Sequence, residues 1–176
     1  KLVTGFIYKG FEKNFIRKCH FPVDTTFFKS DQSIRDDWRE RLKLNKKEIA
    51  IVYTGRFSLQ KNVVRLLREF AVFWKVSPAP VKFFLAGGFD ELGAPLMGIN
   101  FRNGFFYQYW QNQFNQLPKS FRKRVHYLGN LNSSDLLGVS NAADVYASLS
   151  LHHDEDYGMS PAESLCCGTP LVLSSW

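Results

Sequence analysis

The sequence has few cysteines and no long apolar run, and both absences narrow the class of protein. Only three of its 176 residues are cysteine, and Cys166 and Cys167 are neighbours, which rarely form a disulfide with each other. A disulfide-stabilised secreted domain is therefore excluded, and we expect a reducing, cytoplasmic compartment. No apolar run reaches the roughly 18 residues that a membrane-spanning helix needs, and the first residues lack a signal-peptide cleavage pattern.

Acidic residues are the minority charge. Asp and Glu number 16 against 23 Lys and Arg, and the resulting formal charge of +7 favours an anionic partner such as phosphate, nucleic acid or an acidic membrane. Hydrophobic residues make up 45% and charged residues 22%, which excludes disordered, collagen-like and coiled-coil classes. The length suits one domain with one substantial core.

Apolar runs alternate with amphipathic stretches along most of the chain. We predict strands over residues 49–55, 81–88, 124–129, 144–150 and 170–175. We predict helices over residues 31–47, 62–76, 101–117, 134–142 and 161–167. Strands that are apolar throughout and alternate with helices are typical of βαβ units, so the fold class is α/β with a Rossmann-like, doubly wound parallel sheet. Residues 1–30 are expected to form a connector with one or two strand remnants. Residues 31–176 are expected to form a domain that is truncated at its C-terminus and belongs to a longer protein.

Two segments of this pattern are open to more than one interpretation. Residues 99–117 are rich in aromatic and amide side chains; we favour a crossover helix with a decorated loop over a dedicated binding surface. The basic stretch 119–126 is either a solvated face or a contact with an acidic membrane.

The residues after the first predicted strand are suited to binding phosphate. Gly55 allows a tight turn, and Arg56 and Lys61 follow it at the start of a predicted helix. Ligands of doubly wound sheets bind beyond the carboxyl ends of the strands, where two cations beside a helix N-terminus can hold a diphosphate. A basic loop in water is an equal alternative for this segment taken alone.

The residues after the strand expected at 144–150 combine carboxylates with a helix start. Glu155 precedes the helix and Glu163 lies inside it, eight positions later, while Pro161 suits its first turn. The free N–H groups of such a turn attract an anion, and the carboxylates can accept hydrogen bonds from hydroxyls. A phosphorylated sugar fits this combination.

Taken together, GRFSLQKN and, about a hundred residues later, EDYGMSPAESLCCGTPLV resemble the retaining family 4 glycosyltransferases of GT-B fold. The resemblance covers most of the chain and implies the C-terminal, donor-binding half of such an enzyme. Residues 1–30 would then include the interdomain connector, and the partner would be an N-terminal acceptor domain that this chain does not contain.

The resemblance also implies a role for each motif residue. Arg56 and Lys61 would hold the donor diphosphate, Glu163 the ribose hydroxyls, and Glu155 the transferred sugar. Leu131 would brace the nucleobase. The complete donor set is Gly55, Arg56, Lys61, Leu131, Glu155, Gly158, Met159, Ser160 and Glu163, of which Glu155, Arg56 and Lys61 would be catalytic.

No cofactor or metal is expected beyond the nucleoside diphosphate sugar. The chain has no convincing Asp-x-Asp loop, and cations with a helix end can neutralise the leaving diphosphate. His152, His153 and Asp154 lengthen the segment before Glu155 by about two residues relative to the family; adjacent histidines cannot easily meet one ion, so a polar loop is the better interpretation.

We therefore predict a retaining glycosyltransferase that transfers a hexose-like sugar to an unidentified acceptor. The alternative is a nucleic-acid-binding or scaffold module that uses the basic, aromatic surface. That alternative leaves the two glutamates beside an anion site unexplained, so no nucleic-acid partner is expected. A Rossmann dehydrogenase is weaker still because GxGxxG follows none of the strands.

Overall fold

Five parallel strands form the sheet in a computed structural model that describes residues 12, 22–89, 104–150 and 158–175. They are β1 (Ile49–Thr54), β2 (Val81–Ala86), β3 (Val125–Gly129), β4 (Val145–Ser148) and β5 (Leu171–Leu173). Their order is β3-β2-β1-β4-β5, and each neighbouring pair is parallel. The five predicted strands and the Rossmann-like fold class are confirmed.

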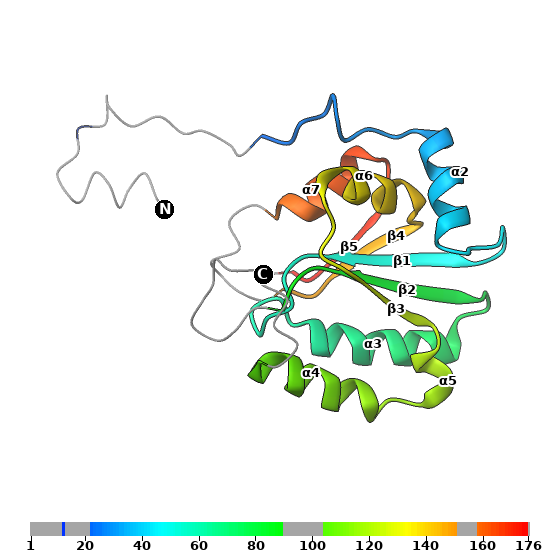
Figure 1. The fold of residues 1–176 in the computed structure, drawn as a ribbon, viewed down its shortest axis with the longest axis vertical. Coiled ribbons are helices and arrows are strands. Elements are labelled where there is room, and N and C mark those ends of the chain that lie inside the picture. Colours follow the sequence, from blue (N-terminus) through cyan, green and yellow to red (C-terminus); the bar gives the residue numbers. More distant parts are fainter. Residues whose placement is uncertain (1–11, 13–21, 90–103, 151–157, 176) are drawn as a thin grey trace.

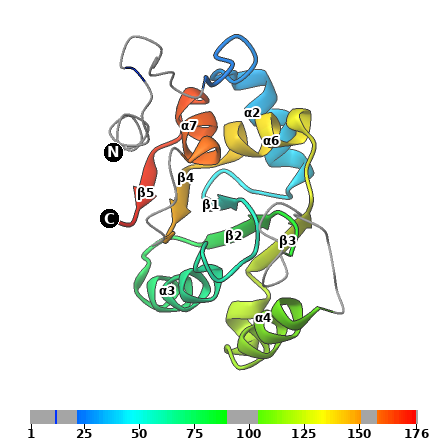
Figure 2. The ribbon, with the colours of Figure 1, turned by 90° about the vertical axis from the view of Figure 1, so that its left-hand side faces the viewer.

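Helices cover both faces of the sheet (Figures 1 and 2). One face carries α2 (Gln32–Arg41), α6 (Ser133–Ala142) and α7 (Met159–Cys166). The other carries α3 (Val63–Val76), α4 (Phe105–Asn115) and the short α5 (Lys119–Arg122). The chain crosses between the faces after β3, as a doubly wound sheet requires.

Successive side chains of β1, the central strand, pack into the two hydrophobic cores on opposite faces of the sheet. Ala50 and Val52 of β1 pack in the cluster beneath α6, together with Val139. Ile51 and Tyr53 pack in the larger cluster beneath α3 and α4. Because both faces of β1 are buried, its sequence is apolar throughout rather than alternating.

Helix α2 is fixed to the sheet through Asp144, which directly precedes β4. The Asp144 carboxylate accepts hydrogen bonds from the guanidinium groups of Arg35 and Arg39 and from the Ala50 N–H. Burial raises the pKa of Asp144, but the hydrogen bonds from Ala50, Arg35 and Arg39 outweigh it, and the pKa lies below its ordinary value. Asp31 caps the helix by accepting a hydrogen bond from the Ile34 N–H at 3.0 Å.

Some boundaries differ from the sequence prediction. Helix α2 ends at Arg41 instead of reaching residue 47, because Lys43 adopts a left-handed conformation with φ of 52°. The four residues of α5 were not predicted as a helix. The helical spacing of the apolar residues in α3 includes Phe73, which is nevertheless 42% exposed, so the buried stripe of the helix is narrower than its apolar stripe.

Two further predictions fall partly on described residues. Within 22–30 the chain forms a turn, in which the Asp24 carboxylate accepts hydrogen bonds from the N–H groups of Thr26 and Phe27, and no strand occurs in this stretch. The rest of the proposed connector lies outside the described residues, apart from Glu12. The helix expected over 101–117 is observed as α4, while 101–103 also lie outside the described residues.

The basic stretch 119–126 forms α5 and the start of β3. Phe121 is fully buried within it, whereas Lys119 and Lys123 are exposed. This segment precedes β3 and so lies at the amino edge of the sheet, opposite the edge where ligands of this fold bind. A membrane contact there stays a prediction; within the described part of the chain, no helix is long and apolar enough to cross a bilayer.

Candidate functional site

The loop between β1 and α3 carries the two basic residues that were predicted to bind phosphate. Gly55 ends the strand, and the half-buried Arg56 and Lys61 follow it. The N–H of Lys61 donates to the hydroxyl of Ser58 at 3.3 Å, which closes a short turn. Asn62 then starts α3 in a left-handed conformation with φ of 52°.

This loop is tied to the end of β4 by side-chain hydrogen bonds. The Asn62 amide donates to the carbonyl of Leu149 at 3.2 Å, and the Ser150 hydroxyl donates to the carbonyl of Gln60 at 3.3 Å. These contacts join residues about ninety positions apart in the sequence. They hold the Lys61 segment against the neighbouring strand.

Three tyrosine hydroxyls brace the carboxyl edge of the sheet. Tyr53 donates to the carbonyl of Arg56 at 2.8 Å, and Tyr127 donates to the carbonyl of Gly87 at 2.7 Å. Tyr146 donates to the carbonyl of Thr54 at 3.1 Å. Sequence reasoning missed this role, because tyrosines inside apolar runs indicate only strands and core.

The ends of β1 and β2 approach each other unusually closely. A Cβ atom at Gly87 would lie 1.9 Å from the carbonyl oxygen of Gly55, and φ at Gly87 is 138°. Hydrogen bonds continue past both strands, from the Gly55 N–H to Ala86 at 2.9 Å and from the Phe57 N–H to Gly88 at 2.8 Å. Only glycine at residue 87 permits this approach, which sets the path of the Arg56 loop.

Helix α7 supplies the second half of the site. Gly158 precedes it in a left-handed conformation, and Met159 and Ser160 open its first turn. The first N–H groups of a helix have no intrahelical partner, so this end carries donors and a positive dipole. Glu163 is half-buried in the same helix, and burial raises the pKa of its carboxyl.

The two predicted motifs follow β1 and β4 in the chain. These strands are neighbours, and the strand order reverses between them, which is where ligands of doubly wound sheets bind. Leu131 lies farther along the same edge: it follows β3, two strands from β1, and packs against the core beneath α6. Glu155 lies outside the described residues, as do His152, His153 and Asp154.

Cys167 lacks the properties of a nucleophile. Cys167 is 5% exposed, and burial together with the nearby Cys166 and Glu163 raises the pKa of its thiol to about 11. The thiolate is the reactive form, so Cys167 is inert near neutral pH. Its burial supports a packing role for Cys167.

The described residues of this edge can therefore hold an anion and a hydroxyl-bearing group together. Arg56 and Lys61 provide charge, the start of α7 provides N–H donors, and Glu163 provides an acceptor. Guanidinium, ammonium and helix N-termini all bind phosphate oxygens.

Comparison with known proteins identifies a family. The family described as Glycosyl transferases group 1 matches residues 34–175. No curated protein matches the chain.

Solved glycosyltransferase structures share the fold. HepE of Anabaena, solved in complex with UDP and glucose, superposes with a TM-score of 0.73 at 21% identity over 97% of this chain and 41% of that one. HepE has also been solved in complex with UDP-glucose. The C-terminal domain of LpcC from Francisella tularensis gives 0.65 at 18% identity, over 86% of this chain and 70% of that one. Sucrose-phosphate synthase from Thermosynechococcus elongatus gives 0.64 at 23% identity, over 87% and 33%. The chain thus spans less than half of the HepE chain.

Proposed function

The chain belongs to the group 1 glycosyl transferases, and we propose that it binds a nucleoside diphosphate sugar at the carboxyl edge of its sheet. The observation that carries this proposal is the adjacency of β1 and β4, whose following segments hold Arg56, Lys61 and the start of α7. Two cations and a positive helix end suit a diphosphate. The UDP and UDP-glucose complexes of HepE support the same ligand class.

Each residue of the site takes one part of the donor in this proposal. Arg56 and Lys61 contact the diphosphate, assisted by the N–H groups of Gly158, Met159 and Ser160. Glu163 accepts from the ribose hydroxyls; its half-buried position favours hydroxyl donors over bulk water.

Two residues complete the proposed donor site. Glu155 contacts the transferred sugar and Leu131 braces the base. Leu131 follows β3, which lies two strands from β1, so the proposed base and diphosphate contacts are at separate points of one sheet edge.

The proposed reaction is transfer of a hexose-like unit with retention of configuration. The glycosidic oxygen of the diphosphate gains negative charge as its bond to the sugar breaks, and fixed cations and N–H donors stabilise that charge without a metal ion. The reacting oxygen of the acceptor must be held within about 3–3.5 Å of the anomeric carbon. We assign this task to a separate N-terminal acceptor domain, as the family resemblance implies.

A thermal unfolding panel tests this function. Nucleoside diphosphates and their sugar conjugates should raise the melting temperature in buffer containing a chelator, while nucleosides should not. A ligand present at about 100 times its Kd stabilises the folded state by about 2.7 kcal/mol. Stabilisation by single-stranded DNA alone would favour the nucleic-acid-binding alternative and count against a donor site.

The two glutamates can be separated by the ligands that they lose. Glu163→Ala should weaken a nucleoside diphosphate and its sugar conjugate alike, because the ribose is common to both. Glu155→Ala should weaken only the conjugate. An equal loss of both ligands in Glu155→Ala, measured by calorimetry, would reject the assignment of Glu155 to the sugar.

A further inference from the structure

The net positive charge of the chain is concentrated at one edge of the sheet. Three segments lead into β1, β2 and β3 there, namely residues 40–48, 75–82 and 118–124. They contain ten of the 23 Lys and Arg but two of the 16 Asp and Glu, and the remaining 13 basic and 14 acidic residues nearly cancel. Figure 1 shows the ends of α2 and α3 and all of α5 on the same side of the domain, at the right. We call the surface of these three segments the basic edge.

A buried carboxylate and an aromatic contact hold the three segments together. Glu48 is buried, and its carboxylate pairs with Lys82 Nζ at 3.1 Å and with Arg124 Nη1 at 3.5 Å, so one acid joins the starts of three neighbouring strands. The rings of Trp74 and Phe121 lie 5.9 Å apart, which places the end of α3 against α5. The basic edge is therefore one continuous surface, although its segments are far apart in the sequence.

Most of the cations of the basic edge project into solvent. The exposed lysines are Lys43, Lys46, Lys47, Lys75, Lys119 and Lys123. None of these six side chains pairs with a carboxylate of a described residue. Lysine is depleted at protein–protein interfaces, and its ammonium group lacks the fork geometry with which arginine binds paired oxygens. The basic edge is therefore suited to a diffuse negative charge and not to an acidic site on another protein.

Exposed apolar side chains adjoin these lysines at the end of α3. Val76, the last residue of the helix, is 73% exposed, and Phe73 is 42% exposed. The two positions are three apart and share one helix face. A membrane interface accepts apolar side chains among its headgroups while neighbouring lysines contact lipid phosphates. Single-stranded nucleic acids are instead bound by aromatic rings that stack on bases, which Val76 cannot do.

We infer that the basic edge docks onto a membrane surface that contains anionic lipids. Clusters of about four to eight basic residues bind such lipids, and the basic edge supplies this number without a membrane-spanning helix. The six residues of β1 separate the amino and carboxyl edges by about 20 Å, so a docked chain leaves its carboxyl edge open to solvent. The surface is distinct from the donor site, and the inference does not depend on the proposed function.

Co-sedimentation with vesicles tests the docking surface. The chain should bind vesicles of phosphatidylcholine with phosphatidylglycerol and not vesicles of phosphatidylcholine alone, and salt should release it because exposed charges are screened. Each lysine near an anionic surface strengthens binding roughly fivefold, so the double variant Lys46→Ala, Lys123→Ala should bind at least about tenfold more weakly. Equal binding of the variant and the unaltered chain would refute the proposal, and so would equal binding to the two kinds of vesicle.

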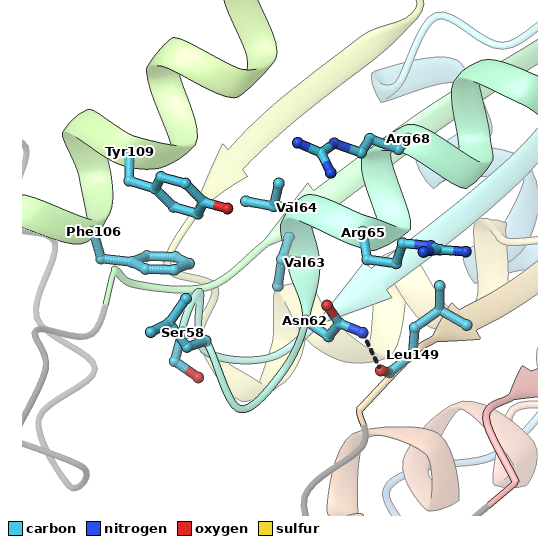
Figure 3. A pocket seen from close by; sticks show the side chains of 10 residues that line it. Ser58, Asn62, Val63, Val64, Arg65, Arg68, Phe106, Tyr109 and Leu149 are labelled. Carbon is cyan, nitrogen blue, oxygen red and sulfur yellow. Dashed lines mark hydrogen bonds between the residues drawn. The ribbon is translucent and has the colours of Figure 1, made fainter.

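The double variant Arg65→Ala, Arg68→Ala is the matched control, because it removes the same number of charges outside the basic edge. Both arginines are exposed on α3, where they line a pocket of about 590 Å³ between α3 and α4 (Figure 3). This variant should bind anionic vesicles as the unaltered chain does. If it loses binding as strongly as the lysine variant, then the net charge of the chain determines binding and the basic edge does not, and the proposal is wrong.

Single-stranded DNA provides the alternative polyanion. Val76→Ser should weaken binding to the anionic vesicles by about threefold, because the apolar contact with the membrane interface is lost, and should leave any binding to DNA unchanged. A chain that binds single-stranded DNA but not the anionic vesicles would identify the basic edge as a nucleic-acid surface and overturn the proposal.

UDP distinguishes the basic edge from the donor site. Because the docked chain leaves its carboxyl edge open, saturation with UDP should not change vesicle binding, and Lys61→Ala should not change it either. The variant Lys46→Ala, Lys123→Ala should in turn bind UDP as the unaltered chain does. Release of the chain from vesicles by UDP would place the lipid headgroup at the donor site and overturn the proposal.

Discussion

Gly87→Ala should damage both the stability of the domain and its ligand site. The new Cβ would lie 1.9 Å from the carbonyl oxygen of Gly55, whereas carbon–oxygen contacts are normally at least about 3.3 Å. The ends of β1 and β2 must therefore separate by more than about 1 Å. That movement breaks or stretches the hydrogen bonds from Gly55 to Ala86 and from Phe57 to Gly88.

The expected cost has two parts. The conformation of Gly87, with φ of 138°, is one that other residues rarely adopt, at a cost of about 1–3 kcal/mol. The two hydrogen bonds contribute about 0.5–1.5 kcal/mol each. We expect Gly87→Ala to lower the free energy of unfolding by about 2–6 kcal/mol.

Gly129→Ala provides the matched control. Gly129 also has positive φ, at 76°, but a Cβ there would meet no atom of the described residues within 4 Å. Its cost should be limited to backbone strain of about 1–2 kcal/mol. Urea denaturation of both variants measures the difference, and equal destabilisation would refute the argument from the Gly55 contact. Because Gly87 sets the path of the Arg56 loop, Gly87→Ala should also weaken UDP binding.

Two further predictions concern α2. The pKa of Asp144 is lowered, so the stabilisation that its carboxylate provides should be present above about pH 4 and lost as the pH falls through its folded pKa. In Asp144→Asn the free energy of unfolding should therefore fall less steeply with decreasing pH. An unchanged pH dependence would count against the pairing of Asp144 with Arg35 and Arg39. Gly138→Ala should destabilise the domain by about 1–3 kcal/mol, because its Cβ would lie 2.0 Å from the indole of Trp38; thermal unfolding would show this, and an unchanged melting temperature would mean that α2 can shift freely.

The sheet could be predicted from the sequence because strands buried on both faces have apolar sequences. β1 and β2 are covered on both faces, so nearly every residue in them is apolar, and the glycines that follow mark the turns. The residues proposed to bind the donor, Arg56, Lys61 and Glu163, stand out in the sequence for a different reason: packing of the sheet does not require charged side chains beyond the ends of its strands.

Other features of the fold are not visible in the apolar pattern of the sequence. Lys43 ends α2 through a left-handed conformation that lysine rarely adopts. Phe73 keeps the helical period but faces a side of α3 that the described part of the domain does not cover. The hydrogen bonds of Tyr53 and Tyr127 to loop carbonyls depend on which strands are neighbours, and so does the pocket between α3 and α4.

Calorimetric titration of UDP into the chain and into Lys61→Ala tests the central claim most directly. Hydrogen bonds to a charged group contribute about 1.5–3 kcal/mol, so the variant should bind about tenfold to a hundredfold more weakly. Lys75→Ala is the matched control: it removes an exposed lysine from the far end of α3 and should leave UDP affinity unchanged. Equal affinity of Lys61→Ala and the unaltered chain for UDP would contradict the assignment of this loop to the donor diphosphate.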